Sequence, residues 1–167
     1  METGEGRVIV ERSAIAKYLI EKYDTAGKFK GNDSIRDEEL TSLAGASIGP
    51  VMMLEMIFDL VVDQSPFFVR WLFAGAQSGI RKVYTGPELD SMFKYLDSQL
   101  GEQDYFMGES PGRADFMVSW PVDFCVQKKY VDLSKYTTLS TWYERCHARA
   151  AWKESLNRGN GYKLGGF

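Results

Sequence analysis

Residues 112–128, GRADFMVSWPVDFCVQK, form the most core-like stretch of the sequence. Aromatic side chains recur within it at every fourth position, at Phe116, Trp120 and Phe124. Residues four apart lie on one face of an α-helix, so this spacing predicts a helix over 114–129. We expect it to be the most core-like helix of the fold.

An acid stands at the start of this helix. Asp115 follows Gly112 by three residues, where a carboxylate can accept the backbone N–H groups of the helix start. Ser110-Pro111 offers a competing cap one turn earlier. A buried carboxylate is also a candidate catalytic group, but we interpret Asp115 as a structural cap.

The chain upstream and downstream of this segment also has helical patterns. A helix capped by Asp33 is predicted over 33–62, with a bend at Gly49-Pro50 because proline lacks a backbone donor. Another is predicted from Ser65-Pro66 to about residue 84, restarting at Thr85-Gly86-Pro87 and ending near Gly101. Shorter helices are predicted over 134–148 and 150–158. The short connections favour an antiparallel helix bundle.

The front of the chain differs from this bundle. Residues 7–10, RVIV, are a β-branched run that predicts a strand with no visible partner upstream. Ser13 can cap a following helix that has apolar residues at helical spacing up to Leu19. Residues 24–32 are rich in turn formers and are interpreted as a linker.

Composition excludes several classes of function. The 167 residues carry a net charge of -3 and scattered lysine and arginine, so no nucleic-acid partner is expected. No apolar run approaches the roughly 20 residues that span a bilayer, so no membrane partner is expected. The two cysteines predict reduced thiols rather than a metal site or a disulfide framework. His147 is the only histidine, and no Gly-x-Ser-x-Gly sequence accompanies it, which disfavours a hydrolase.

Four stretches carry a resemblance to a known family: VIVERSAI at 8–15, YFMG at 105–108, GRAD at 112–115 and SWP at 119–121. In order and spacing the chain resembles the cytosolic glutathione transferases, and more narrowly their fungal-type branch. The first stretch is similar to the family's last strand and Glu-Ser-x-Ala-Ile turn. The third is similar to the start of the central helix of its all-helical domain.

The resemblance covers about residues 7–162 and implies a mainly α fold. Residues 33–167 are expected to form a helical bundle of the transferase C-terminal type. Residues 1–24 are expected to be the last strand and helix of a thioredoxin-like α/β domain whose front is absent, joined by a linker over 25–32. The family's catalytic Tyr, Ser or Cys lies just after the first strand of that domain, so no residue here matches it, and the catalytic group is expected outside this chain.

The resemblance assigns glutathione binding to Glu11, Arg12 and Ser13. Glutathione's γ-glutamyl end carries an ammonium and a carboxylate, which need an acid and hydrogen-bond donors respectively. Arg12 stands where the family usually has serine; it either binds the carboxylate through two contacts or points to solvent and leaves this role to Ser13. A plain strand-to-helix turn is the alternative for all three residues.

Met52, Met53 and Met56 are candidates for an adaptable pocket that takes hydrophobic electrophiles. Ordinary core packing or a dimer contact is the alternative, and the one we favour.

The resemblance implies an enzyme of detoxification that conjugates glutathione to hydrophobic electrophiles. It implies glutathione as co-substrate, no metal, no tightly bound cofactor, a homodimer and a cytoplasmic location. A non-catalytic dimerisation or scaffold module is the alternative function. A third interpretation is that the true protein is longer than this chain.

Overall fold

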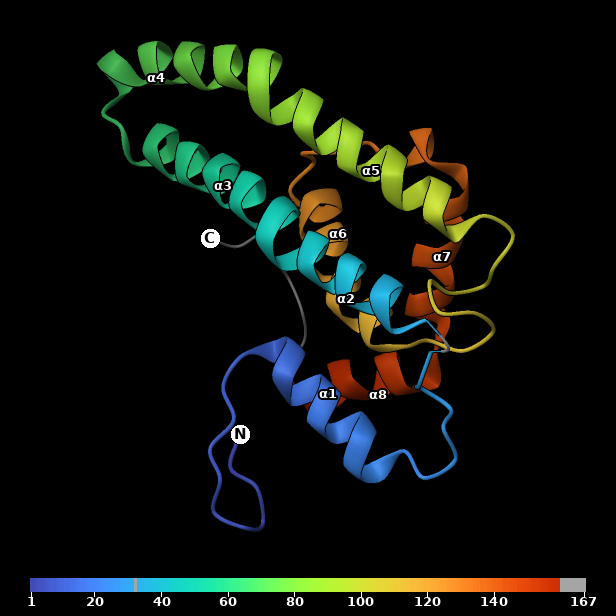
Figure 1. Cartoon of the computed structure of the whole chain (residues 1–167). Helices are drawn as coiled ribbons and strands as arrows, with labels where there is room; N and C mark the ends of the chain where they lie inside the picture. Colours follow the sequence, from blue (N-terminus) through green and yellow to red (C-terminus); the bar gives the residue numbers. More distant parts are fainter. Residues whose placement is uncertain (32, 160–167) are drawn as a thin grey trace.

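The computed structural model describes residues 1–31 and 33–159, and nearly all of its regular structure is helical (Figure 1). The end of the predicted helical domain, 160–167, and position 32 of the predicted linker lie outside the described residues. In chain order the elements are α1 (Arg12–Tyr23), α2 (Ser34–Ser42), the π-helix η1 (Leu43–Ile48), α3 (Gly49–Gln64), α4 (Phe67–Ile80), the π-helix η2 (Arg81–Thr85), α5 (Gly86–Leu100), α6 (Arg113–Gln127), the 3₁₀-helix η3 (Leu133–Lys135), α7 (Thr137–Ala148) and α8 (Ala150–Arg158).

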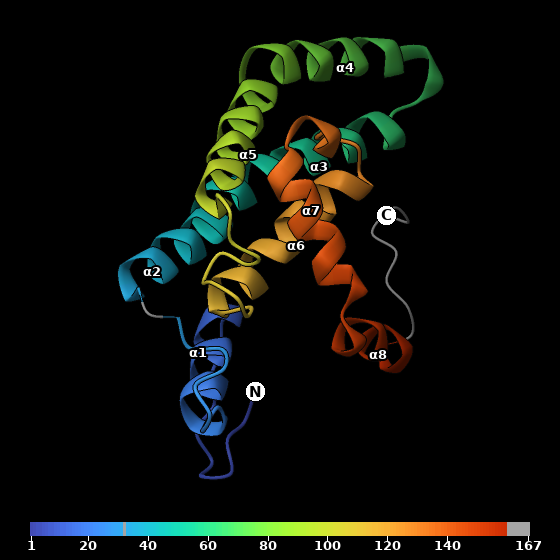
Figure 2. The same ribbon diagram turned by 90° about the vertical axis from the view of Figure 1, so that its right-hand side faces the viewer.

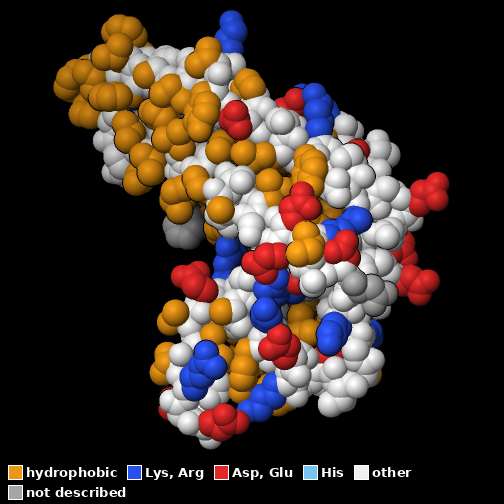
Figure 3. Space-filling view, viewed as in Figure 1, with side chains coloured by type: hydrophobic (Ala, Val, Ile, Leu, Met, Phe, Trp, Pro, Cys, Tyr) orange, Lys and Arg blue, Asp and Glu red, His pale blue; other side chains and the backbone are white. Residues whose placement is uncertain are grey.

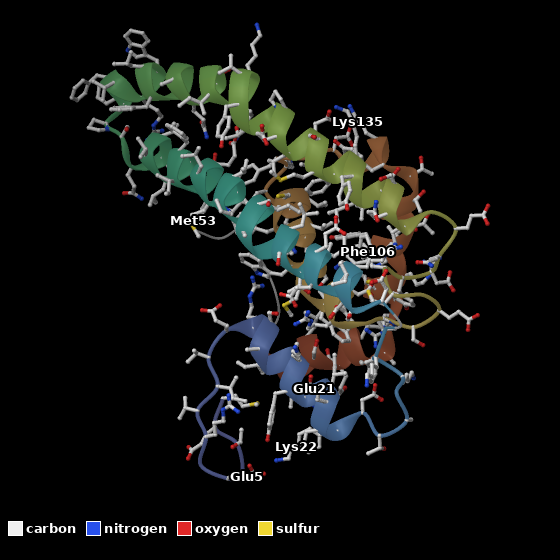
Figure 4. All side chains as sticks on the ribbon, in the orientation of Figure 1. Glu5, Glu21, Lys22, Met53, Phe106 and Lys135 are labelled. Carbon is white, nitrogen blue, oxygen red and sulfur yellow. The ribbon has the colours of Figure 1, made fainter. Side chains whose placement is uncertain are left out.

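The strand predicted over 7–10 does not form. Val8 makes a single isolated antiparallel bridge to Glu2, and no sheet is present in the described part of the chain. The Ile9 N–H donates to the Met1 carbonyl at 2.8 Å and the Thr3 N–H to the Arg7 carbonyl at 2.8 Å, so residues 1–9 fold back on themselves. An isolated pair of short strands is only marginally stable in water, which explains why this segment forms a single bridge and not a sheet. Lys22 of α1 anchors the loop by an ion pair with Glu5 at 3.3 Å (Figure 4).

The Gly-Pro pairs do not interrupt the long helices. The α2, η1 and α3 segments form one unbroken helix over 34–64, and α4, η2 and α5 form another over 67–100. Each Gly-Pro pair directly follows a π-helical turn, in which the N–H of one residue bonds to the carbonyl five residues earlier. At the second turn the Gly86 N–H donates to the Arg81 carbonyl. The restart predicted at Thr85 is therefore wrong, since the helix continues through it.

Both long helices change direction near their middle. Figure 2 shows a bend between α2 and α3 and another between α4 and α5, and α4 projects away from the body. The turn joining α3 to α4 lies at the opposite end of the molecule from residues 1–24 (Figure 1).

The helix over 34–64 is long and apolar enough to cross a membrane by length and composition, with 22% of its most apolar window buried. A helix that packs on a soluble core passes the same test. Glu55 lies within this helix, almost completely buried, and it accepts hydrogen bonds from Arg81 and Thr85. These partners tie the helix to η2, and the expected absence of a spanning segment stays a prediction.

The central position predicted for α6 is confirmed. It packs against α1, α2, α3 and α7 (Figure 2). Its most completely buried face carries Ala114, Val118 and Val122. The aromatic positions differ from one another: Phe124 is buried, whereas Phe116 and Trp120 are half-buried.

Asp115 is a structural cap, as predicted. Its carboxylate accepts the Gly112 N–H at 2.8 Å, the Phe106 N–H at 2.9 Å and the Trp142 indole N–H at 2.8 Å. Burial raises the pKa of Asp115, and these donors oppose that shift. The helix begins at Arg113, so the competing cap at Ser110-Pro111 is not used.

Candidate functional site

The turn that opens α1 has an unusual backbone. Glu11 is the residue that precedes the helix, and its φ of 71° and ψ of 127° lie outside the regions that non-glycine residues usually adopt. Its carbonyl accepts the Ile15 N–H at 3.0 Å, which starts the helix at Arg12. No side chain caps this end. The first N–H groups of α1 and the positive end of its dipole are therefore available to an anion.

Ser13 does not cap the helix, contrary to the prediction, because it lies one residue inside it. Its hydroxyl instead accepts a long hydrogen bond of 3.4 Å from Arg113.

Arg113 joins the start of α1 to the bundle. Its guanidinium pairs with Asp37 at 2.8 Å and with Glu38 at 2.6 Å, both at the front of α2. Asp37 also accepts the Ala114 N–H at 3.0 Å. Hydrogen bonding and charge from Arg113 hold the pKa of Glu38 below its ordinary value.

Sequence analysis missed this role of Arg113. A cation in the first turn of a helix opposes the helix dipole and needs another reason to be there. The adjacent acids Asp37 and Glu38, near the start of α2, supply that reason, so the sequence contained a signal for this ion pair.

Arg12 is exposed and also contacts an aromatic ring of α6. Its guanidinium carbon lies 4.5 Å from the centre of the Trp120 ring, an arrangement in which a cation is attracted to an aromatic face. The first turn of α1 thereby touches α6 at its half-buried aromatic position.

Trp120 is also one wall of an apolar pocket of about 530 Å³. The pocket is lined by Met52, Met53, Met56, Leu60, Trp120 and Phe124, with Asp59, Asp63 and Lys128 as its polar residues. Figure 4 shows Met53 on the side of α3 that faces the start of α1.

The three predicted methionines therefore meet at one cavity, but they contribute unequally. Met52 is buried in the core, in agreement with the packing alternative, whereas Met53 keeps 44% of its surface exposed. Met56 packs partly against the core.

The remaining candidate groups do not form a reactive centre. Burial raises the pKa values of Cys125 and Cys146 to about 12, so neither thiol is an available nucleophile near neutral pH. Nδ1 of His147 lies 2.8 Å from the Tyr143 carbonyl. Within 1–31 and 33–159, no group of His, Cys, Asp and Glu is arranged to hold a metal ion.

Comparison with known proteins identifies relatives of the chain. Residues 65–150 match the family model of the glutathione S-transferase C-terminal domain. Glutathione S-transferase 3 of Schizosaccharomyces pombe is 27% identical over 141 residues, which are 83% of this chain and 58% of that protein. Glutathione S-transferase 1 of Saccharomyces cerevisiae is 20% identical over 162 residues, 94% of this chain and 69% of that one. The chain thus spans less than two thirds of the first relative.

Solved structures share the fold. A glutathione S-transferase from Xylella fastidiosa superposes with a TM-score of 0.73 at 18% identity, covering 96% of this chain and 74% of that one. Ure2p5 from Phanerochaete chrysosporium, cocrystallised with 1-(S-glutathionyl)-2,4-dinitrobenzene, gives 0.71 at 22% identity and covers 93% and 70%.

Proposed function

Because the chain belongs to the glutathione S-transferase family, we propose that it carries part of a site that conjugates glutathione to hydrophobic electrophiles. The observation that carries the proposal is the contact of Arg12 with Trp120, which places the α1 turn at the edge of the methionine pocket. One side chain thus links the polar and apolar halves of the site.

The polar half suits the γ-glutamyl end of glutathione. The exposed carboxylate of Glu11 attracts the ammonium, and the N–H groups at Ser13 and Ala14 face the carboxylate at the positive end of α1. The unusual Glu11 backbone costs about 1–3 kcal/mol, and such conformations concentrate at binding sites. Arg12 adds positive charge nearby while its guanidinium stays on Trp120.

The apolar half suits the electrophile. A volume of about 530 Å³ accommodates a small aromatic molecule, and flexible methionines adapt to its shape. The conjugate spans both halves, so it gains contacts that glutathione alone does not make.

We assign no catalytic residue within these 167 residues and propose that the group stabilising the glutathione thiolate is supplied outside them. Lowering a thiol's pKa raises the fraction of attacking thiolate at neutral pH. We also retain, as proposals, the division at 1–24, 25–32 and 33–167, the absence of a tightly bound cofactor, a cytoplasmic homodimer and a role in detoxification. A non-catalytic dimerisation or scaffold module is the second candidate function.

Calorimetric titration of the chain separates the two functions. We expect 1-(S-glutathionyl)-2,4-dinitrobenzene to bind more tightly than glutathione and Glu11→Gln to weaken both. Glu21→Gln, an exposed acid at the other end of α1, is the matched control and should bind as the unmodified chain does. Binding of neither compound would favour the scaffold.

A further inference from the structure

The methionine pocket is a long groove, because two helix faces line it. On α3 the lining runs from Met52 to Asp63, and on α6 it runs from Trp120 to Lys128. An α-helix rises about 1.5 Å per residue, so these faces extend the pocket over roughly 12–16 Å. The volume of about 530 Å³ is therefore spread along the space between α3 and α6.

Contacts around the pocket show which ends of the two faces lie together. At one end the Trp120 ring lies under the Arg12 guanidinium, and Met53 lies on the side of α3 that faces the start of α1 (Figure 4). We call this the near end of the groove. It adjoins the turn to which glutathione binding is assigned above.

The far end of the groove lies at Tyr130, just past the end of α6. The Tyr130 hydroxyl donates to Asp59 of α3, and the Tyr130 ring centre lies 6.1 Å from that of Phe124. Asp59 also accepts a hydrogen bond from Gln77 at 2.7 Å, so partners within the protein hold its carboxylate. The groove thus runs from the α1 turn towards the C-terminal ends of both α3 and α6.

The lining changes from apolar to polar along this direction. Methionine and aromatic side chains line the near half, whereas Asp63 and Lys128 border the far end. Figure 3 shows hydrophobic side chains gathered over α4 and the end of α3 that contains Leu60 and Asp63. Met53 is 44% exposed and Leu60 is 54% exposed, so both ends of the groove are open to an entering molecule. An occupant that extends from Met53 past Leu60 meets a carboxylate and an ammonium at its tip.

We propose that the groove selects long-chain aliphatic electrophiles that end in a neutral hydroxyl group. This inference names the substrate class of the proposed function and rests on it. With C–C bonds of about 1.5 Å, an extended chain of about ten carbons reaches from Trp120 to Asp63. A hydroxyl both donates and accepts, so it suits Asp63 and Lys128 together, whereas a charged end group is repelled by one of them.

The apolar middle of the groove favours a chain over a single ring. A ring beside Trp120 leaves the far half of the groove in contact with water, whereas a chain covers it. Flexible methionine side chains adapt to such a chain along its length. The affinity should therefore rise about two- to fourfold for each methylene that enters the groove.

S-alkyl derivatives of glutathione measure the usable length of the groove, because their sulfur fixes the position of the near end. In calorimetric titrations we expect the affinity to rise from S-methylglutathione through S-hexylglutathione to S-decylglutathione. Leu60→Ala should weaken binding of the decyl compound about three- to tenfold and of the hexyl compound less, whereas Met53→Ala should weaken both. A maximum at the hexyl compound, or equal losses for both compounds in Leu60→Ala, would overturn the proposal.

The S-(ω-hydroxydecyl) derivative tests the polar end. It should bind about two- to tenfold more tightly than the decyl compound, and Asp63→Ala should remove this advantage. Glu102→Ala, which removes an exposed acid just after α5, is the matched control and should keep it. Equal affinities of the two compounds for the unmodified protein would show that the far end does not recognise a hydroxyl. Circular dichroism should show unchanged helix content in each variant, since the substituted side chains are exposed.

Free alcohols separate this inference from the proposed function. Hexanol and decanol carry no glutathione, so their binding depends on the groove alone. If no glutathione compound binds, the proposed function fails, yet tighter binding of decanol than of hexanol that Leu60→Ala reduces would still support the groove. A lack of length dependence in both series would overturn the inference itself.

Discussion

The Arg12 guanidinium lies over the Trp120 ring, with its carbon 4.5 Å from the ring centre, although the two residues are more than a hundred positions apart in sequence. The contact joins the first turn of α1 to the central helix. It also makes Trp120 a shared element of the helix turn and the apolar pocket.

Separating this pair should weaken the conjugate site. Trp120→Leu removes the pocket wall and the surface on which Arg12 rests, so we expect the affinity for the dinitrobenzene conjugate to fall about 3- to 10-fold, and that for glutathione to fall less. A double-mutant cycle with Arg12→Ala, followed by urea unfolding, should give a coupling of about 0.5–1 kcal/mol. Zero coupling would show that the contact is not formed in solution.

Replacing Asp115 should damage the fold. Asp115→Ala leaves the N–H groups of Gly112, Phe106 and Trp142 without their acceptor, so we expect a loss of about 3–5 kcal/mol in the free energy of unfolding. Asp132→Ala, at an exposed cap of η3, is the control and should cost less than about 1 kcal/mol. A stable Asp115→Ala protein that no longer binds glutathione would instead give the carboxylate a role in the site.

The pair of Glu38 with Arg113 should give a pH-dependent contribution to stability. The pKa of Glu38 is lowered in the folded protein, so the folded state binds this proton more weakly than the unfolded chain does. The stabilisation is therefore present above the ordinary pKa of 4.5 and is lost as the pH falls through the lowered value. Glu38→Gln should cost less than about 1 kcal/mol at pH 7, because the side chain is 62% exposed, and nothing at the acid end. Urea unfolding across this pH range measures the difference; equal losses at both ends would contradict it.

The thiols of Cys125 and Cys146 should be unreactive in the folded protein. Burial raises the pKa values of both thiols to about 12, so we expect almost no reaction with Ellman's reagent at pH 8 until the chain is unfolded. Reaction in denaturant counts both thiols and is the control. Rapid labelling of one thiol in the folded state would reveal local opening of α6 or α7.

The spacing of apolar residues predicted most of the helices, because the faces that this spacing defines are the faces that pack in the folded protein. The aromatic spacing of Phe116, Trp120 and Phe124 located α6, and Asp33 capped α2 as expected, accepting the N–H groups of Ile35 and Arg36. The strand at 7–10 failed because its β-branched residues describe a local preference, whereas a strand requires pairing partners that composition does not specify.

The candidate site was less predictable than the helices. Glu11, Arg12 and Ser13 are adjacent in sequence, but they point to different partners, and the contact of Arg12 with Trp120 depends on how α1 packs on α6. The methionine spacing indicated one helix face without indicating whether that face meets a core or a cavity. The structure contains both, since Met52 is buried and Met53 is exposed.

The π-helical turns at η1 and η2 have a consequence for how the long helices evolve. Each residue advances an α-helix by about 100°, so one extra residue within a turn redirects every side chain beyond it by that angle. Deleting a single residue at η2 would leave a helix there, yet it would rotate the aromatic groups of α4 about the helix axis relative to α5. The orientation of the outer end of the molecule is thus set by the length of a turn several residues away, and not by the aromatic residues themselves.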